Sequence, residues 1–319
     1  MPQHQHENHR STKGPGKIIA VGGAKGGIGK SLFVANLGVL LSQLGKKTVL
    51  VDLDLGASNL HLYMGLWSLP HCIDDFLNKT VSCIDDIMVP TKYGPRLIGG
   101  GGCKLGDANI HFSRKVKLLR AIKDLEADYV IIDLGGDTTY NILDFYLAAD
   151  QGLILTTCEP ASYMDAYGFI KLSLQRKLTR LFGAESVHYK NRDRHLEQLI
   201  RDFFFSSDTA HARHISNLLS HLENEYPSQV PFVKKVIDDF RPATIVTMIQ
   251  AQAQVDELVT RLKNVSRKIL SIDLDYFGSL PFESQVQQSA VDLVPYVSRT
   301  SNGNFTKALR RITLRMEMV

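Results

Sequence analysis

Gly22-Gly23-Ala24-Lys25-Gly26-Gly27-Ile28-Gly29-Lys30-Ser31 is the stretch that decides the fold. It follows a short apolar run, Ile18 to Val21, and precedes a segment, Leu32 to Leu44, whose apolar residues recur at helical spacing. This order predicts a buried strand, a glycine-rich loop and a helix. Glycines let backbone N–H groups approach a phosphate, and the helix start adds a favourable dipole. The loop therefore predicts a phosphate site in which Lys30 reaches the terminal phosphates and the Ser31 hydroxyl binds Mg²⁺.

Apolar runs alternate with helical patterns along the rest of the chain. A further helix is predicted at Ser113 to Leu125. Further strands are predicted at Thr48 to Asp52, Leu97 to Ile98, Tyr129 to Asp133, Gly152 to Thr156, Thr244 to Ile249 and Asp275 to Leu280. This alternation predicts an α/β fold with a doubly wound, mostly parallel sheet, which binds ligands at the carboxyl ends of its strands.

Composition narrows the class of protein. The chain has 319 residues, 44% of them hydrophobic, which is enough for a substantial core. Its net charge of +4 permits contact with an anionic surface without requiring it. The four cysteines, Cys72, Cys83, Cys103 and Cys158, form no CxxC pair, and no apolar run approaches the length of a membrane span. These features predict a cytoplasmic protein without a disulfide framework.

Acidic residues close two of the predicted strands. Asp52 and Asp54 end the second strand, and strand alternation points both carboxylates the same way, toward a shared Mg²⁺–water site. Asp133 ends the strand from Tyr129, where a rigidly held carboxylate suits Mg²⁺ and its waters. Gly135 and Gly136 follow it, and their backbone is suited to sensing a terminal phosphate.

Two regions depart from the α/β alternation. Residues 1–16 are polar and predict a disordered tail before a domain at 17–319. The stretch at about 177–231 predicts an inserted helical subdomain, because apolar residues such as Leu196, Leu199 and Ile200 have helical spacing. His211, His214 and His221 in this insertion are either metal ligands or solvated surface, and the second interpretation is favoured.

The glycine-rich loop, with Ala24 in place of the usual first glycine, is similar to the deviant Walker A loop of the bacterial MinD/ParA family of P-loop ATPases. The run Asp133-Leu134-Gly135-Gly136-Asp137 and the segment from Leu280 to Val286 resemble the FlhG/FleN branch of that family. The resemblance implies that ATP and Mg²⁺ bind. It also implies that Lys25 reaches across a homodimer to the partner's phosphates, and that Asp54 orients the attacking water.

The resemblance also implies a set of ligand contacts. Mg²⁺ is assigned to Ser31, Asp52 and Asp133. Thr247 or Gln250 stands where the family often has an asparagine that contacts the base. The nucleotide contacts implied are Gly26, Gly27, Ile28, Gly29, Lys30, Ser31, Leu32, Asn59, Gly135, Gly136, Thr247 and Pro281.

The function implied is a dimerising switch ATPase that positions a flagellum, a division site or another cargo through a protein activator or cargo protein. A metal-cluster carrier is disfavoured by the scattered cysteines. The last segment, Phe305 to Val319, is amphipathic and either binds a membrane or docks on the domain. A DNA-binding partition ATPase is an alternative because the insertion and its start carry Arg176, Lys177, Arg180, Lys190, Arg192 and Arg194.

Overall fold

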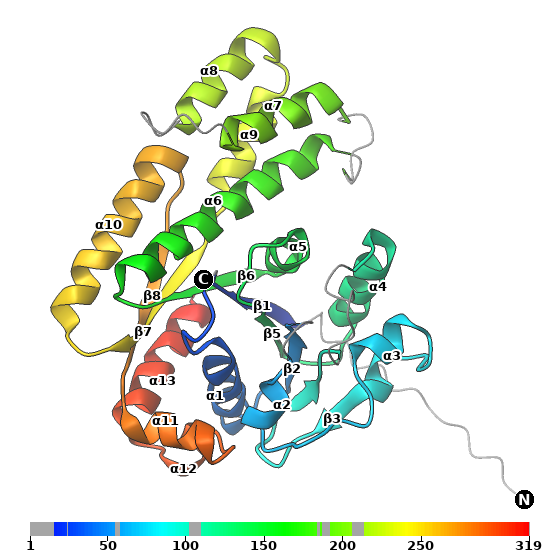
Figure 1. Ribbon diagram of the computed structural model, residues 1–319, viewed down its shortest axis with the longest axis vertical. Helices are drawn as coiled ribbons and strands as arrows, with labels where there is room; N and C mark the ends of the chain where they lie inside the picture. The colour runs from blue at the N-terminus through cyan, green and yellow to red at the C-terminus, as the bar shows by residue number, and fades with distance from the viewer. Residues whose placement is uncertain are drawn as a thin grey trace, which may run out of the picture.

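The computed structural model describes residues 16–23, 25–54, 58–101, 110–183, 186, 192–205 and 214–318. The predicted tail up to residue 15, together with Ala24, Cys103, Lys190 and His211, lies outside these ranges. The described chain forms an eight-stranded sheet with helices on both faces (Figure 1). The strands are β1 (Lys17–Gly22), β2 (Thr48–Leu53), β3 (Met88–Pro90), β4 (Arg96–Ile98), β5 (Tyr129–Leu134), β6 (Gln151–Thr156), β7 (Ala243–Ile249) and β8 (Asp275–Pro281).

The strand order, β3-β4-β2-β5-β1-β6-β7-β8, confirms the doubly wound sheet. The described strand pairs are parallel except for β3 with β4, which are antiparallel. β1 lies inside the sheet between β5 and β6, where its apolar side chains are buried on both faces. The loop after β1 therefore opens at the carboxyl edge of the sheet, where such folds bind ligands.

Helices cover the two faces of the sheet in two separate groups (Figure 1). One face packs against α4, α5, α6 and α10, and the other against α1, α12 and α13. The helices are α1 (Lys30–Gln43), α2 (Leu60–Tyr63), α3 (Ile73–Leu77), the 3-10 helix η1 (Ile84–Ile87), α4 (Phe112–Lys123), α5 (Tyr140–Ala148), α6 (Pro160–Phe182), α7 (Arg194–Phe205), α8 (Ile215–Glu225), α9 (Val230–Asp238), α10 (Gln252–Leu270), α11 (Ser284–Val291), α12 (Tyr296–Arg299) and α13 (Asn304–Glu317).

The helical insertion begins later and ends later than its sequence predicts. α6 continues through Lys177 to Phe182 as one helix of 23 residues, and Leu174, Leu178 and Phe182 extend its buried face to the end. The helices α7 to α9 then occupy 194–238, beyond the predicted end at 231. Leu196 and Ile200 of α7, with Leu218 of α8, are buried in the same core as α6. In Figure 1 these helices stand over the far half of α6, away from the sheet.

The amphipathic segment near the end of the chain is α13, and its apolar face is docked. Phe305, Leu309, Ile312 and Met316 are each at most 2% exposed, in the core beneath β8 and α1. Lys17 Nζ of β1 also donates a hydrogen bond of 2.7 Å to the Met316 carbonyl. The membrane-anchor alternative is therefore wrong for this face of α13, since the core already covers it. Among the described residues, no helix combines the length and apolarity needed to cross a bilayer.

Candidate functional site

The glycine-rich loop between β1 and α1 forms the floor of a cavity of about 530 Å³. Tyr63 of α2 and Gln287 of α11, which the sequence did not indicate, also line the cavity. Gly135 and Lys25 do not line it. The predicted contacts that do line it are Gly26, Gly27, Ile28, Gly29, Lys30, Ser31, Leu32, Asp54, Asn59, Gly136, Thr247 and Pro281.

The loop holds a conformation that its glycines allow. Gly27 and Gly29 have φ angles of 76° and 87°, in the left-handed region that side chains disfavour. Lys30 is buried, and its Nζ donates a hydrogen bond of 2.9 Å to the Lys25 carbonyl, which closes the loop on itself. Burial lowers the pKa of Lys30, although the carboxylates of Asp133 and Asp54 act in the opposite direction. A phosphate in the cavity would complete the coordination of this ammonium group.

Asp133 is a buried carboxylate whose hydrogen bonds are incomplete. It is 2% exposed, and its Oδ1 has no hydrogen-bond partner among the described residues. Burial, and then the neighbouring carboxylate of Asp52, raise the pKa of Asp133 well above its usual range, although the Ser31 hydroxyl bonds to it. An uncompensated buried oxygen next to a hydroxyl suits Mg²⁺, which prefers such hard oxygen ligands. Asp133 and Ser31 therefore fit the predicted metal site.

Asp52 lies beside Asp133, as its partner in the register of β2 and β5, but its oxygens are occupied. Oδ2 accepts hydrogen bonds from Ser58 Oγ (2.8 Å) and from the N–H groups of Asn59 (3.1 Å) and Leu60 (3.0 Å). Oδ1 accepts one from the Asp54 N–H at 3.0 Å. Burial raises the pKa of Asp52, although these hydrogen bonds act to lower it. Asp52 thus positions Asp54 and the start of α2, and its direct contact with Mg²⁺ stays a prediction.

Two glycines let the segment after β5 approach the phosphate loop. A Cβ on Gly136 would lie 3.1 Å from the Gly26 nitrogen, and one on Gly135 would lie 3.3 Å from Asp54 Oδ1. Both contacts are tighter than side chains normally make, so larger residues would push the segments apart. The segment after β5 is therefore close enough to respond to a ligand in the loop.

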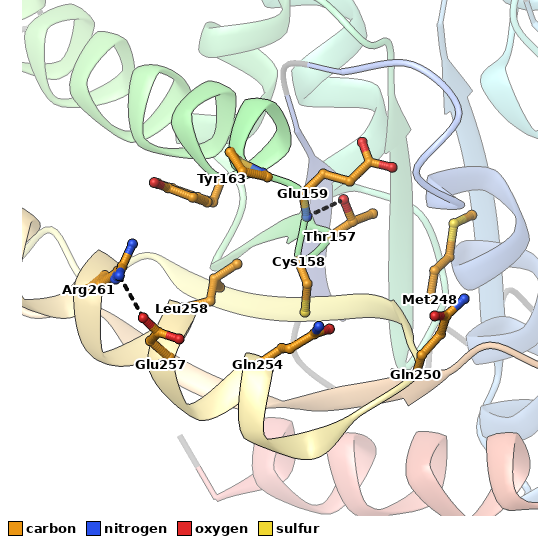
Figure 2. A pocket seen from close by; sticks show the side chains of 11 residues that line it. Thr157, Cys158, Glu159, Tyr163, Met248, Gln250, Gln254, Glu257, Leu258 and Arg261 are labelled. Carbon is orange, nitrogen blue, oxygen red and sulfur yellow. Dashed lines mark hydrogen bonds and ion pairs between the residues drawn. The ribbon is translucent and has the colours of Figure 1, made fainter.

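Lys25 points away from its own cavity. Its Nζ forms an ion pair of 2.8 Å with Glu159, just before α6, and the two side chains are 37% and 68% exposed. The hydrogen bond to Glu159 raises the pKa of Lys25. Glu159 lines a second cavity, of about 430 Å³, which Figure 2 shows between the start of α6 and α10.

Thr247 supports the loop rather than offering its hydroxyl to a base. The hydroxyl donates to the Ile28 carbonyl at 2.8 Å and lies 3.3 Å from the Thr156 carbonyl. Gln250 lines only the second cavity in Figure 2. Met248, which follows Thr247 in the chain, lines both cavities and has a left-handed φ of 56°. No pattern in the sequence indicated this residue.

The basic residues considered as a DNA surface differ in exposure: Arg176 is buried, Lys177 and Arg180 are half-buried, and Arg192 and Arg194 are exposed. Only Arg176 is removed from a DNA surface by burial, and the alternative stays a prediction for the others. Arg176 is buried and donates two hydrogen bonds (2.8 and 2.9 Å) to Asp144 of α5, and Arg180 donates a third at 3.4 Å. Lys177 Nζ lies 5.3 Å from the centroid of the Phe240 ring. Arg192 donates to the Ser186 carbonyl at 3.4 Å.

The structure also bears on the metal alternatives. Cys72, Cys83 and Cys158 are free thiols, and the described residues hold no cluster of three metal-binding side chains. His214 Nδ1 lies 2.8 Å from the Lys268 carbonyl, and His221 lies 3.4 Å from Glu225. Within the described chain, neither a metal-cluster site nor a histidine site is formed.

Comparisons with known proteins agree with this geometry. A family model described as the CobQ/CobB/MinD/ParA nucleotide binding domain matches residues 19–296. The antiactivator FleN of Pseudomonas aeruginosa is 28% identical over 160 residues, which cover 50% of this chain and 56% of FleN. The septum site-determining protein MinD of Synechocystis is 35% identical over 153 residues, covering 47% of this chain and 56% of that MinD. The chain thus spans a little over half the length of these curated relatives.

Solved structures show the same fold. The MinC:MinD cell division complex of Aquifex aeolicus superimposes with a TM-score of 0.63 at 20% identity, over 95% of this chain and 96% of that one. The MinD structure of Pyrococcus horikoshii, complexed with Mg-ADP, gives a TM-score of 0.57 at 15% identity, over 94% and 95% of the two chains. On the sequence match, the site and the fold, the protein belongs to the CobQ/CobB/MinD/ParA family of nucleotide-binding domains.

Proposed function

We propose that this protein is a Mg²⁺-dependent ATPase that forms a homodimer on binding ATP and acts in the cytoplasm to position a cellular structure. The observation that carries the proposal is the unpartnered, buried Oδ1 of Asp133, whose carboxylate bonds to Ser31, a residue that lines the glycine-rich cavity. A buried carboxylate in this state is costly, so it supports a missing cation rather than a structural role.

The side chains divide the chemistry between them. The loop N–H groups and Lys30 bind the phosphates, and Ser31 and Asp133 hold Mg²⁺, which neutralises charge on the phosphate oxygens. Asp54 lines the cavity, and its backbone N–H is held by Asp52, so its carboxylate is placed to orient a water toward the terminal phosphate. Phosphoryl transfer needs positioning and charge stabilisation more than covalent help, and the site provides both.

The dimer is supported by the direction of Lys25. The Lys25 ammonium group lies outside its own nucleotide cavity, and its partner Glu159 is mostly exposed. Lys25 could therefore exchange Glu159 for a phosphate of the nucleotide bound to a second copy with little rearrangement. Relatives include the flagellum site-determining protein YlxH of Helicobacter pylori, 29% identical over 170 residues, in addition to FleN and MinD. Their names favour positioning of a flagellum or septum through a protein activator or cargo protein.

Asp54→Ala tests the proposal. The expected result is a loss of ATP turnover of about 100-fold or more, because the water is no longer oriented, with ATP affinity nearly unchanged. Asp86→Ala, an exposed aspartate in η1, is the matched control and should leave turnover intact. Normal turnover in Asp54→Ala would contradict the assigned role.

The homodimer is tested with the same variant by sedimentation. Asp54→Ala in ATP should sediment as a dimer and in ADP as a monomer. Lys25→Ala, combined with Asp54→Ala, should stay monomeric in ATP while still binding it. A monomer under every condition, at concentrations that saturate the site, would refute the dimer.

A further inference from the structure

Two apolar side chains are exposed where α2 and α11 end. Trp67, the chain's single tryptophan, is 81% exposed, and Val291 is 72% exposed. Their segments meet, because a Cβ on Gly65 would lie 3.1 Å from the Leu293 carbonyl oxygen. The same Cβ would lie 3.5 and 3.6 Å from the Lys92 and Tyr93 side chains. We call Trp67, Val291, Lys92 and Tyr93 the Trp67 patch. Large exposed apolar side chains on adjoining segments are typical of binding surfaces.

The elements that carry the patch also form a wall of the nucleotide cavity. Tyr63 of α2, four residues before Trp67, lines the cavity, as do Gln287 and Ala290 of α11, immediately before Val291. The start of α2 is fixed by Asp52, whose Oδ2 accepts from the Asn59 and Leu60 N–H groups. A ligand that moves this wall therefore moves the elements that present Trp67 and Val291.

The end of α11 holds the patch in a strained but well-defined conformation. Leu293 has a φ of 56°, a left-handed conformation that favours glycine. Its N–H donates to the Ala290 carbonyl at 3.2 Å, and the Val294 N–H donates to the Ser289 carbonyl at 3.0 Å. These two bonds close the helix end in a fixed turn. Helices commonly end in this way, so the turn fixes the position of the patch without itself indicating a function.

The charges at this junction define what the patch can bind. Arg299 is paired with Asp292, which directly precedes Leu293. Lys92 Nζ, by contrast, lies over the Tyr93 ring at 5.1 Å and has no carboxylate within ion-pair distance in the described chain. The patch thus combines an exposed indole with one uncompensated positive charge.

We propose that the Trp67 patch docks a second, different protein through a segment that offers an apolar side chain to Trp67 and a carboxylate to Lys92. Nucleotide in the cavity governs this docking through α2 and α11, and this part rests on the proposed function. The indole supplies most of the buried apolar area, and the ion pair fixes the orientation of the partner.

The test uses a photocrosslinking amino acid, benzoylphenylalanine, at Val291 in the cell that makes the full chain, with Phe232 of α9 as the control position. Phe232 is 52% exposed, and its helix α9 lies at the opposite end of the molecule from α2 and α11 in Figure 1. The expected product is a crosslink from position 291, and not from 232, to a different protein within a segment that contains apolar and acidic residues. With that partner purified, Trp67→Ala and Lys92→Glu should each weaken binding about tenfold or more. Reversing the partner's acidic residue to lysine should restore binding to Lys92→Glu.

Several outcomes would overturn the proposal. These are crosslinks to a second copy of the chain or to lipid alone, no crosslink, or no rescue by the reversed charge. ATP turnover of Trp67→Ala separates the two proposals, since this side chain lies outside the cavity and turnover should be unchanged. Turnover without docking refutes the patch. If docking does not depend on nucleotide and the chain does not hydrolyse ATP, the proposed function and the nucleotide control are both refuted. The docking surface would still stand in that case.

Discussion

Two buried aspartates, Asp133 near the end of β5 and Asp144 in α5, have opposite surroundings. Asp144 is 1% exposed and accepts from Arg176, Arg180 and Lys115. Burial alone would raise its pKa, but Arg176 and Lys115 outweigh burial and lower it. Asp133 is equally buried, lies next to another carboxylate, and has a raised pKa and an unpartnered oxygen.

The contrast distinguishes a structural charge from a functional one. The fold surrounds Asp144 with cations and thereby joins α4, α5 and α6. It leaves Asp133 without an equivalent cation, although Lys30 is close enough to influence its pKa. Burial alone therefore does not mark a functional carboxylate. The incomplete set of partners does.

The largest expected effect is a difference in protein stability between substitutions at Asp144 and at Asp133. Asp144→Asn leaves three cations without their carboxylate, so the free energy of unfolding should fall by about 3–5 kcal/mol. Asp133→Asn removes an uncompensated buried charge and should leave stability unchanged or slightly higher. Unfolding in urea, without metal or nucleotide, measures both. Equal losses in the two variants would remove the distinction.

The stability gained on ligand binding should depend on Asp133 and not on the Asp144 cluster. Mg²⁺-ADP at about 100 times its dissociation constant should stabilise the wild type by about 2.7 kcal/mol. Arg180→Gln, a change at the Asp144 cluster, should keep this gain, whereas Asp133→Asn or chelation of Mg²⁺ should remove most of it. Thermal unfolding with and without ligand is the measurement. A full gain in Asp133→Asn would show that Mg²⁺ does not depend on this carboxylate.

The cost of Asp144→Asn should also depend on pH. The folded pKa of Asp144 lies below the value of about 3.9 for a free aspartate, so its contribution is fully present above that value. It is lost as the pH falls toward the folded pKa, at no more than about 1.4 kcal/mol per pH unit. The difference between wild type and variant should thus be constant from pH 5 to 8 and shrink below about pH 4. A difference that grows on acidification would contradict the assignment.

A smaller effect is expected at Thr247, which supports the glycine-rich loop. Thr247→Val removes the hydrogen bond to Ile28 and should cost about 1 kcal/mol of stability. The KM for ATP should rise, because the loop is less well held, with kcat less affected. Thr244→Val in the same strand loses a bond to the Asp275 carbonyl and is the matched control. It should lose similar stability without the change in KM.

The smallest effect is expected at the exposed ion pair. Glu159→Gln should leave the melting temperature unchanged within error, since water and salt screen this contact with Lys25. Glu126→Gln, which breaks the exposed pair with Lys47, should behave alike. A clear loss only in Glu159→Gln would show that the pair holds the loop in place.

The sequence was sufficient for features that depend on local pattern and topology. The phosphate loop follows from glycines between an apolar strand and a helix. The nearness of Asp52 and Asp133 follows from parallel strands that end at one edge, and the structure pairs them in register. The edge strand β3 was missed because it has three residues, ends in Pro90 and runs antiparallel.

Features that depend on tertiary partners were not predictable in the same way. The periodicity of α13 gave its apolar face but not the surface that covers it. Arg176 and Arg180 were considered as part of a DNA surface, although their spacing of four residues puts both on the helix face that meets Asp144. Thr247 was considered for the base, but the bend of β7 turns its hydroxyl toward Ile28.

The hydrogen bond between Lys17 and Met316 joins residues 299 positions apart, and it has a consequence for how the chain folds. β1 pairs with β5 and β6, which are synthesised more than 100 residues later, and α13 closes over β8 last. Contacts of such long range slow folding, because chain entropy is lost before they form. On the ribosome, the glycine-rich loop is therefore synthesised early, and it lacks the neighbouring strands of its sheet until β5 and β6 have been made.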